Sequence, residues 1–305
     1  MTESSDLTKV AGRDETRPDD LNDRRARVST DYETILFSES EGIGWLTLNR
    51  PQALNAFDDR MQREVRSLYR DLRRNDDVRV LVITGAGDRA FCSGADRHDV
   101  SAHYYDDLAT RPEPLIGPVS STPFMVNDAA ENLGPKSCGL WKPVIAAVNG
   151  LACGGAFYVL GECDFIIASE DATFFDPHLD YGIAPIYEPI NLLDVMPLQE
   201  VLRLALLGGS ERMSAHRAHQ VGLVSEVVAA DELHERARWA ATVIATYRPV
   251  AVQAALRAIW HAKATSRRQG LDQAYAFVAL GNDREAVDEG QQRFTTGSRP
   301  AWRLR

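Results

Sequence analysis

The spacing of apolar and polar positions predicts two strands followed by a helix at the start of the folded chain. Residues 32–40 and 43–51 both read as strands, and Glu41-Gly42 between them is typical of a hairpin turn. Apolar residues then recur at steps of four, three and four, as on one face of a helix. These residues are Met61, Val65, Leu68 and Leu72.

Further apolar stretches follow, separated by turn residues. Residues 78–87 and 142–150 read as strands buried on both faces, and shorter strands are expected at 163–169 and 172–177. The pair Gly154-Gly155 opens a short helix. Strands that alternate with helices in this way predict an α/β fold. Beyond Pro185 the pattern becomes mostly helical, with helices expected at 197–209, 214–222, 232–247 and 249–263.

Composition narrows the class of protein. A formal net charge of −10 over 305 residues argues against a nucleic-acid binder, which needs a basic surface. The four cysteines lack zinc-site spacing, and no apolar run is long enough for a membrane span or a signal peptide. We therefore expect a cytoplasmic protein with neither membrane nor nucleic acid as a partner.

The chain divides into three parts by composition and periodicity. Residues 1–30 mix both signs of charge with few apolar residues and are expected to be a disordered tail. Residues 31–228 carry the alternating pattern and form the expected core, and residues 229–305 form a helical C-terminal region. Within the core, the segment 97–141 has much weaker periodicity, which is typical of a functional or mobile segment.

Five stretches occur in an order that resembles the crotonase family, also called the enoyl-CoA hydratase/isomerase family. They are LTLNRPQALNAF, VLVITGAGDRAFCSGADRHDV, KPVIAAVNGLACGG, CDFIIASEDATF and ERMSAHRAHQVGLVSEVV. The resemblance implies a spiral of ββα turns and an acyl-CoA thioester as ligand. It also implies a homotrimer or a dimer of trimers, assembled through the helical C-terminal region. Coenzyme A is then part of the substrate, and no separate cofactor or metal is expected.

Two glycine-containing loops, FCSGAD and CGGAF, each follow a predicted strand and can direct backbone N–H groups into one space. An enolate formed from a thioester needs two such donors on its oxygen, already oriented. By the resemblance, the donors are the N–H groups of Ala95 and Gly155. The alternative is that these glycines only shape tight turns.

The resemblance also implies contacts to coenzyme A, mostly through backbone, at two loops. The positions are Ala53, Leu54, Asp96 and Arg97. Arg50 and Arg97 are candidates for the phosphates, because a guanidinium binds phosphate through two hydrogen bonds. Arg299 is a further candidate. Each arginine also fits a solvated surface charge.

The chain departs from the family at the two glutamates that its hydratases use to add water. By the resemblance these positions hold Tyr158 and His178 here. A phenol with a pKa near 10 is a poor base at neutral pH but a good donor, whereas an imidazole with a pKa near 6.5 can act as acid or base. The hydratase mechanism therefore cannot simply be inherited.

His178 is our candidate for the acid–base group, the alternative being a structural histidine hydrogen-bonded beside Asp176. Asp180 lies on the same face as His178 if the segment is extended, and a carboxylate there orients the imidazole. Tyr158 either lines the acyl pocket and donates to the substrate or packs in the core. Glu162 reads as a structural partner of its helix rather than a base, and Glu188 is a further candidate base.

Three hypotheses of function remain open. The first is an enzyme that hydrates, isomerises or hydrolyses a specialised acyl-CoA, with a bulky or ring-bearing acyl group. The second is an acyl-CoA-binding relative without chemistry, and the third is a structural subunit. His98, His103, Tyr104 and Tyr105 in the irregular segment read as exposed loop residues rather than as a recruited base.

Overall fold

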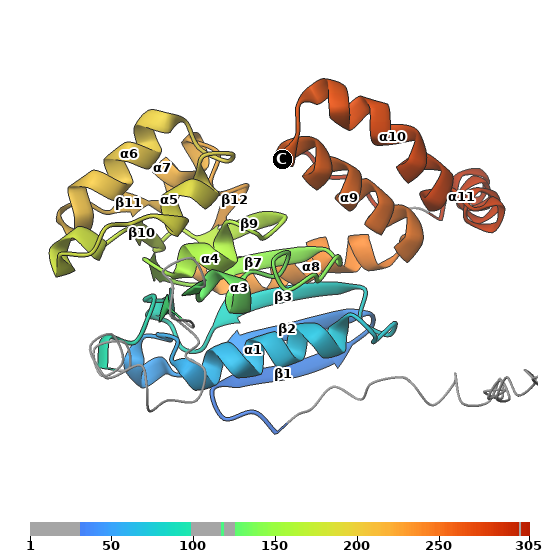
Figure 1. Ribbon diagram of the computed structural model, residues 1–305. Coiled ribbons are helices and arrows are strands. Elements are labelled where there is room, and N and C mark those ends of the chain that lie inside the picture. The colour runs from blue at the N-terminus through green and yellow to red at the C-terminus, as the bar shows by residue number, and fades with distance from the viewer. Residues whose placement is uncertain (1–30, 99–116, 119–125, 299) are drawn as a thin grey trace, which may run out of the picture.

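The computed structural model describes residues 31–98, 117–118, 126–298 and 300–305 (Figure 1). The predicted disordered tail, the loop residues His103, Tyr104 and Tyr105, and Arg299 lie outside these ranges.

A six-stranded sheet forms the centre of the fold, in the order β1-β2-β3-β7-β9-β12. The strands are β1 (Ile35–Ser40), β2 (Ile43–Leu48), β3 (Val80–Gly85), β7 (Val144–Val148), β9 (Phe165–Ser169) and β12 (Glu226–Val228). β1 and β2 are an antiparallel hairpin, as predicted, and the other neighbours are parallel.

A smaller sheet has the order β11-β10-β8-β4. Its strands are β4 (Ala90–Cys92), β8 (Leu151–Cys153), β10 (Thr173–Phe175) and β11 (Met213–Ser214), and a separate pair joins β5 (Gly117–Pro118) to β6 (Val126–Asn127). The chain passes from the large sheet to the small one three times, from β3 to β4, β7 to β8 and β9 to β10. This repeat confirms the predicted α/β spiral of ββα turns.

Helices cover both faces of the large sheet (Figure 1). On one face lies α1 (Asp59–Leu72), whose first turn is capped by the Asp58 carboxylate, and its predicted apolar residues are all buried. On the other face lies α8 (Leu233–Ala245). Successive side chains of β3 point to opposite faces of the sheet. Leu81 lies in the core under α1, and Val82 lies in the core under α8.

Shorter helices surround the small sheet. They are α3 (Ala130–Leu133), α4 (Ala156–Leu160), α5 (Tyr187–Leu192), α6 (Leu198–Leu207) and α7 (Ala215–Gln220). Ser214 caps α7, as expected, by accepting a hydrogen bond from the Arg217 N–H at 3.2 Å. The segment after β10 forms a 3-10 turn, His178–Tyr181, and not an extended strand.

The C-terminal region is helical, but its first helix belongs to the core. The buried face of α8 packs on the large sheet, so the packing changes after Ala245 and not at residue 228. The pair α9 (Pro249–Ala264) and α10 (Arg267–Gly281) then projects from the sheets, and α11 (Arg284–Thr296) follows (Figure 1). Self-association through this region stays a prediction. Among the described residues, no helix is both long and apolar enough to cross a membrane.

Candidate functional site

The two predicted glycine loops meet because they follow β4 and β8, which are parallel neighbours in the small sheet. Gly94 has φ of +86°, and a Cβ at this residue would lie 3.0 Å from the Cys153 carbonyl oxygen and 3.1 Å from the Gly155 nitrogen. Only glycine allows both this conformation and this approach. The structure therefore brings the N–H groups of the two loops into one region.

Ala95 and Gly155 both carry an N–H group that donates no hydrogen bond to another described residue. On either side of Ala95, the Gly94 carbonyl accepts from the Phe57 N–H and the Asp96 N–H donates to the Phe57 carbonyl. Gly155 precedes α4, and a Cβ there would lie 2.6 Å from the Phe57 ring. Free N–H groups next to one another are what a developing oxyanion requires.

The loop at residues 50–57 packs against the first of these glycine loops. Leu54 and Asn55 both adopt positive φ, of 53° and 56°, which is uncommon for residues other than glycine. The buried Asn55 amide stabilises this turn by accepting from the Arg50 N–H and donating to the Ala86 and Ala90 carbonyls. The Ala53 and Leu54 carbonyls accept hydrogen bonds from Ser93.

Arg50 is paired within the protein, and its contact with a phosphate stays a prediction. Its guanidinium is paired with Asp96 at 2.8 Å, lies 3.4 Å from the Asp58 carboxylate and donates to the Ala56 carbonyl at 2.7 Å. Burial alone would raise the pKa of Asp96, but the Arg50 hydrogen bond and the His98 N–H hold it below its usual value. Arg50 and Asp96 thus join the two loops. Arg97 is exposed, and no other described residue pairs with it.

The next feature is a cluster of titratable side chains around His178, beside the second glycine loop. A Cβ on Gly154 would lie 3.5 Å from the His178 ring carbon Cε1. The ring nitrogen Nδ1 lies 2.5 Å from Asp176 Oδ1, and Nε2 lies 3.5 Å from Glu188 Oε1. Asp176 and Glu188 are 0% and 1% exposed, and one oxygen of each, Oδ2 and Oε1, has no hydrogen-bond partner.

Charges in this cluster favour a protonated imidazole. Burial alone would lower the pKa of His178, but the Asp176 hydrogen bond and the charges of Glu188, Asp176 and Asp128 together raise it above its ordinary value. Burial raises the pKa of the Asp128 carboxyl, and the nearby Glu188 adds to this effect. His178 therefore keeps its proton to a higher pH than an ordinary imidazole does.

The prediction that Asp180 orients His178 is wrong. The 3-10 turn directs the Asp180 carboxylate away from the imidazole, toward the Gly209 N–H, which donates to it at 2.6 Å. Asp176 orients the ring instead, two residues before it, and also accepts the His178 backbone N–H at 3.0 Å. From the sequence, this contact is the structural alternative to an acid–base role for His178.

Tyr158 is 8% exposed and lies between the rings of Phe57 and Tyr187, with centroid distances of 6.2 and 6.5 Å. Burial raises the pKa of its hydroxyl, and Glu188 and Asp128 raise it further, Glu188 also as its hydrogen-bond partner. Tyr158 is thus a buried donor within the cluster. Glu162 is outside the cluster: its carboxylate accepts the backbone N–H and hydroxyl of Ser137, as expected of a structural partner.

Asp176, His178 and Glu188 each offer one ligand atom, and these atoms lie within 4.8 Å of one another. Such a spacing prompts the question of a metal ion. Nδ1 of His178 faces Asp176 and Nε2 faces Glu188, so each ring nitrogen is placed to exchange a proton with a carboxylate. We therefore interpret the group as an acid–base cluster.

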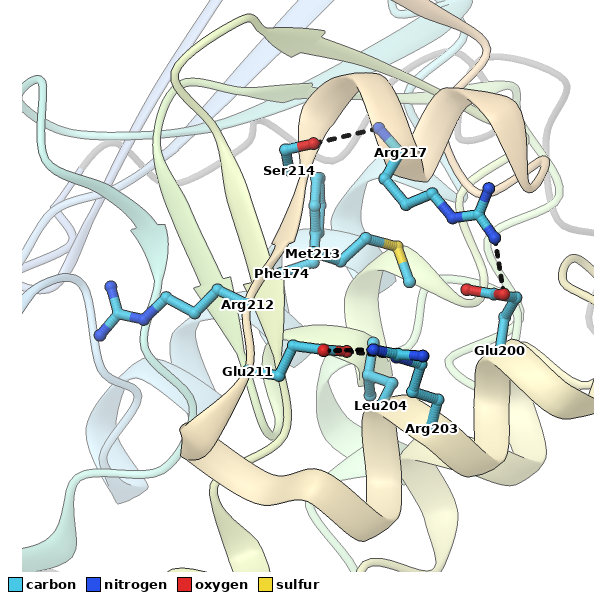
Figure 2. Close-up of a pocket in the computed structure, with 9 residues that line it drawn as sticks. All are labelled: Phe174, Glu200, Arg203, Leu204, Glu211, Arg212, Met213, Ser214 and Arg217. Carbon is cyan, nitrogen blue, oxygen red and sulfur yellow. Dashed lines mark hydrogen bonds and ion pairs between the residues drawn. The ribbon is translucent and has the colours of Figure 1, made fainter.

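A separate pocket of about 320 Å³ lies between α6 and the β11–α7 segment, behind Phe174 (Figure 2). Its charged side chains are mostly paired with one another. Arg203 binds Glu211 through two hydrogen bonds of 2.6 Å, and Arg217 binds Glu200 at 2.7 Å. Arg212 points away from both pairs and lies over the Phe175 ring. The pocket offers no unpartnered buried group among the described residues.

Comparison with known families agrees with this geometry. The family model described as enoyl-CoA hydratase/isomerase matches residues 43–293. The chain belongs to the enoyl-CoA hydratase/isomerase family. The resemblance drawn from the five sequence stretches is therefore confirmed.

Several members of the enoyl-CoA hydratase/isomerase family are similar over most of the chain. An (E)-benzylidenesuccinyl-CoA hydratase from Thauera aromatica is 30% identical over 88% of this chain and 98% of its own length. A 1,2-epoxyphenylacetyl-CoA isomerase from Escherichia coli is 36% identical over 70% of this chain and 77% of its own. The crystal structure of an enoyl-CoA hydratase/isomerase from Mycobacterium paratuberculosis superposes with a TM-score of 0.78, at 36% identity, and covers 90% of this chain and 100% of that one.

Two carboxylates near His178 were poorly predicted from the sequence. Glu188 was only a further candidate, and Asp128 was not considered. Glu188 reaches the imidazole from α5, ten residues along the chain, and Asp128 comes from the segment before α3. Neither belongs to a periodic pattern or a motif, so the sequence carried no signal for their position.

Proposed function

We propose that the protein is an enzyme that acts on acyl-CoA thioesters through an enolate. The Ala95 and Gly155 N–H groups, from adjoining loops and without partners among the described residues, are the observation that carries the proposal. They donate to the thioester oxygen as it gains negative charge. A pair of preorganised donors of this kind stabilises the transition state more than the ground state.

In this proposal His178 transfers the proton, and Asp176 orients its ring through Nδ1. Because the surroundings favour the imidazolium, His178 starts as an acid. As water adds to the β-carbon of an enoyl thioester, His178 delivers the Nε2 proton to the α-carbon of the resulting enolate, and the neutral imidazole then takes up the proton that the added water loses. An isomerisation would begin instead from the neutral imidazole, which removes a proton from the substrate and returns it at another carbon.

We also propose a ring-bearing acyl group. Tyr158 lies against both Phe57 and Tyr187, Phe57 adjoins Gly155, and the half-exposed Tyr187 offers aromatic surface to such a group. Two similar proteins have names that specify benzylidenesuccinyl-CoA and epoxyphenylacetyl-CoA. The coenzyme A part is assigned to the backbone of Ala53 and Leu54 and to the exposed Arg97, and the active form to a trimer or a dimer of trimers.

Mass spectrometry of CoA thioesters incubated with the purified protein tests the proposal. The panel contains crotonyl-CoA, a long-chain enoyl-CoA, cinnamoyl-CoA and a cyclic β-keto acyl-CoA. Gain of one water identifies a hydratase or ring hydrolase, and solvent deuterium incorporated without a further mass change identifies an isomerase or other enolate chemistry.

The variant His178→Ala should lose turnover while it keeps its affinity for the thioester. Unchanged turnover would remove His178 from the mechanism. Binding of the thioesters without product or deuterium exchange from any of them would instead support the second hypothesis, a binding protein without chemistry.

A further inference from the structure

Glu188 is a buried carboxylate whose position the packing alone does not explain. It lies in the first turn of α5, a six-residue helix otherwise rich in exposed apolar side chains such as Ile186 and Ile190 nearby. Its own side chain points inward and is 1% exposed. Its oxygen Oε1 has no hydrogen-bond partner, and it faces Nε2 of His178 at 3.5 Å.

A buried carboxylate with one oxygen unsatisfied is costly, so its presence requires a reason. Three carboxylates, from Asp176, Glu188 and Asp128, act on the His178 imidazole, and His178 is the group among them that can carry positive charge. The Tyr158 hydroxyl faces the same carboxylates as a neutral donor. A charged His178 is thus the compensation available to the buried carboxylates among these groups.

Asp176 and Glu188 face different nitrogens of the His178 ring. Asp176 is bound to Nδ1 at 2.5 Å, which is a short hydrogen bond. Glu188 lies 3.5 Å from Nε2, outside ordinary hydrogen-bond length, so it attracts the charge without capturing the proton. Nε2, which must release its proton in the proposed reaction, is therefore the ring nitrogen without a short hydrogen bond.

We propose that Glu188 is a positioning residue that, from the Nε2 side, keeps His178 charged and in one orientation as the proton donor. One carboxylate from α5 then stands between Tyr158 and His178, which are the two side chains in the positions of the hydratase glutamates. The inference rests on the proposed function for its catalytic part. The effect of Glu188 on the charge of His178 is measurable without any substrate.

The experiment is a pH titration of the His178 ring by NMR in the full chain, labelled with ¹³C at histidine Cε1. The seven histidines give seven signals, and the spectrum of His178→Asn assigns the one of interest. In Glu188→Gln the carboxylate becomes a neutral amide of the same shape, and we expect the His178 midpoint to fall by about one pH unit or more. Glu211→Gln, an exposed carboxylate paired with Arg203, is the matched control and should leave the midpoint unchanged.

Glu188→Asp keeps the negative charge but moves it away from His178 by one methylene. Its His178 midpoint should therefore lie between those of Glu188→Gln and the wild type. Glu188→Asp also serves if Glu188→Gln fails to fold by circular dichroism, because a retracted charge should still lower the midpoint. An unchanged midpoint in the folded Glu188 variants would overturn the inference, whatever their turnover.

Kinetics then separate the inference from the proposed function. On any thioester that the wild type converts, Glu188→Gln should lower kcat at pH 8 with little change in KM, and the alkaline limb of the profile should move by the shift seen in NMR. A shifted midpoint without turnover of any thioester supports the effect of Glu188 on His178 and overturns the proposed function. Turnover with an unmoved alkaline limb overturns the catalytic role of Glu188 and leaves the proposed function in place.

Discussion

Two of the places where charged side chains gather in the described part of the chain differ in how those charges are satisfied. In the pocket behind Phe174, Glu200 and Glu211 each bind an arginine, and the pairs are partly exposed to solvent (Figure 2). Around His178, three carboxylates share one imidazole, and two buried oxygens have no partner.

The difference indicates where chemistry is to be expected. Exposed ion pairs gain little free energy and tolerate loss, so they can gather on a surface without a function. Buried carboxylates cost free energy unless they are compensated, and such groups cluster at functional sites. Buried charge without a partner therefore marks the His178 cluster as the place for chemistry, and the paired charges of the pocket do not share this property.

The largest effect is expected from Asp176→Asn. The amide cannot replace the short hydrogen bond that orients Nδ1, so turnover should fall by roughly 10²–10⁴, the range that general acid–base catalysis contributes. Steady-state kinetics on a converted thioester measures it. A loss of less than about threefold would mean that Asp176 does not orient a catalytic ring.

Gly155→Ala should reduce turnover by about 10²–10³, the value of one oxyanion donor. The new Cβ would meet the Phe57 ring at 2.6 Å, so the loop must move and carry its N–H away. Gly290→Ala is the control, because a Cβ there meets no atom within 4 Å. Equal kcat values for the two variants would contradict the assignment of the Gly155 N–H.

Asn55→Ala should reduce stability and affinity for coenzyme A together. The change leaves the Arg50 N–H and two carbonyls without their partner, which costs about 1–3 kcal/mol for a buried group. Urea unfolding and titration with coenzyme A measure the two effects. Lost stability with unchanged affinity would separate this turn from coenzyme A binding.

The contribution of His178 to stability should depend on pH in one direction. Its pKa is raised in the fold, so the contribution is complete below about 6.5, the ordinary value, and is lost as pH rises through the folded pKa. Urea midpoints at pH 6 and pH 9 should therefore differ more in wild type than in His178→Asn. An equal difference in both proteins would show that the surroundings of His178 do not favour its charged form.

The smallest effect is expected in the pocket behind Phe174. Arg203→Ala removes an exposed pair with Glu211, and we expect no resolvable change in the urea midpoint or in turnover. A clear loss of turnover would show that this pocket, and not only the His178 cluster, takes part in the function.

Local patterns in the sequence were sufficient for much of the fold and for the glycine loops. The apolar face Met61, Val65, Leu68 and Leu72 lies in the core as its spacing predicts, because a helix against a sheet must bury that stripe. Gly94 and Gly155 could be selected from the chain because their backbone requirement is local and because parallel strands end at one edge. His178 was selected because imidazole titrates near neutral pH.

Contacts between distant or irregular segments were decided only by the tertiary structure. Whether Asp176 or Asp180 orients His178 depends on a 3-10 turn, which reverses the side-chain directions that an extended segment would give. Arg50 is bound to Asp96, 46 residues away, and no composition or spacing reveals that its charge is already compensated. Glu188 reaches the imidazole because α5 packs beside α4, and its burial strengthens the effect of its charge on His178. Sequence determines which groups can do the chemistry, whereas packing decides which of them face one another and how strongly, because electrostatic energy depends on distance and burial.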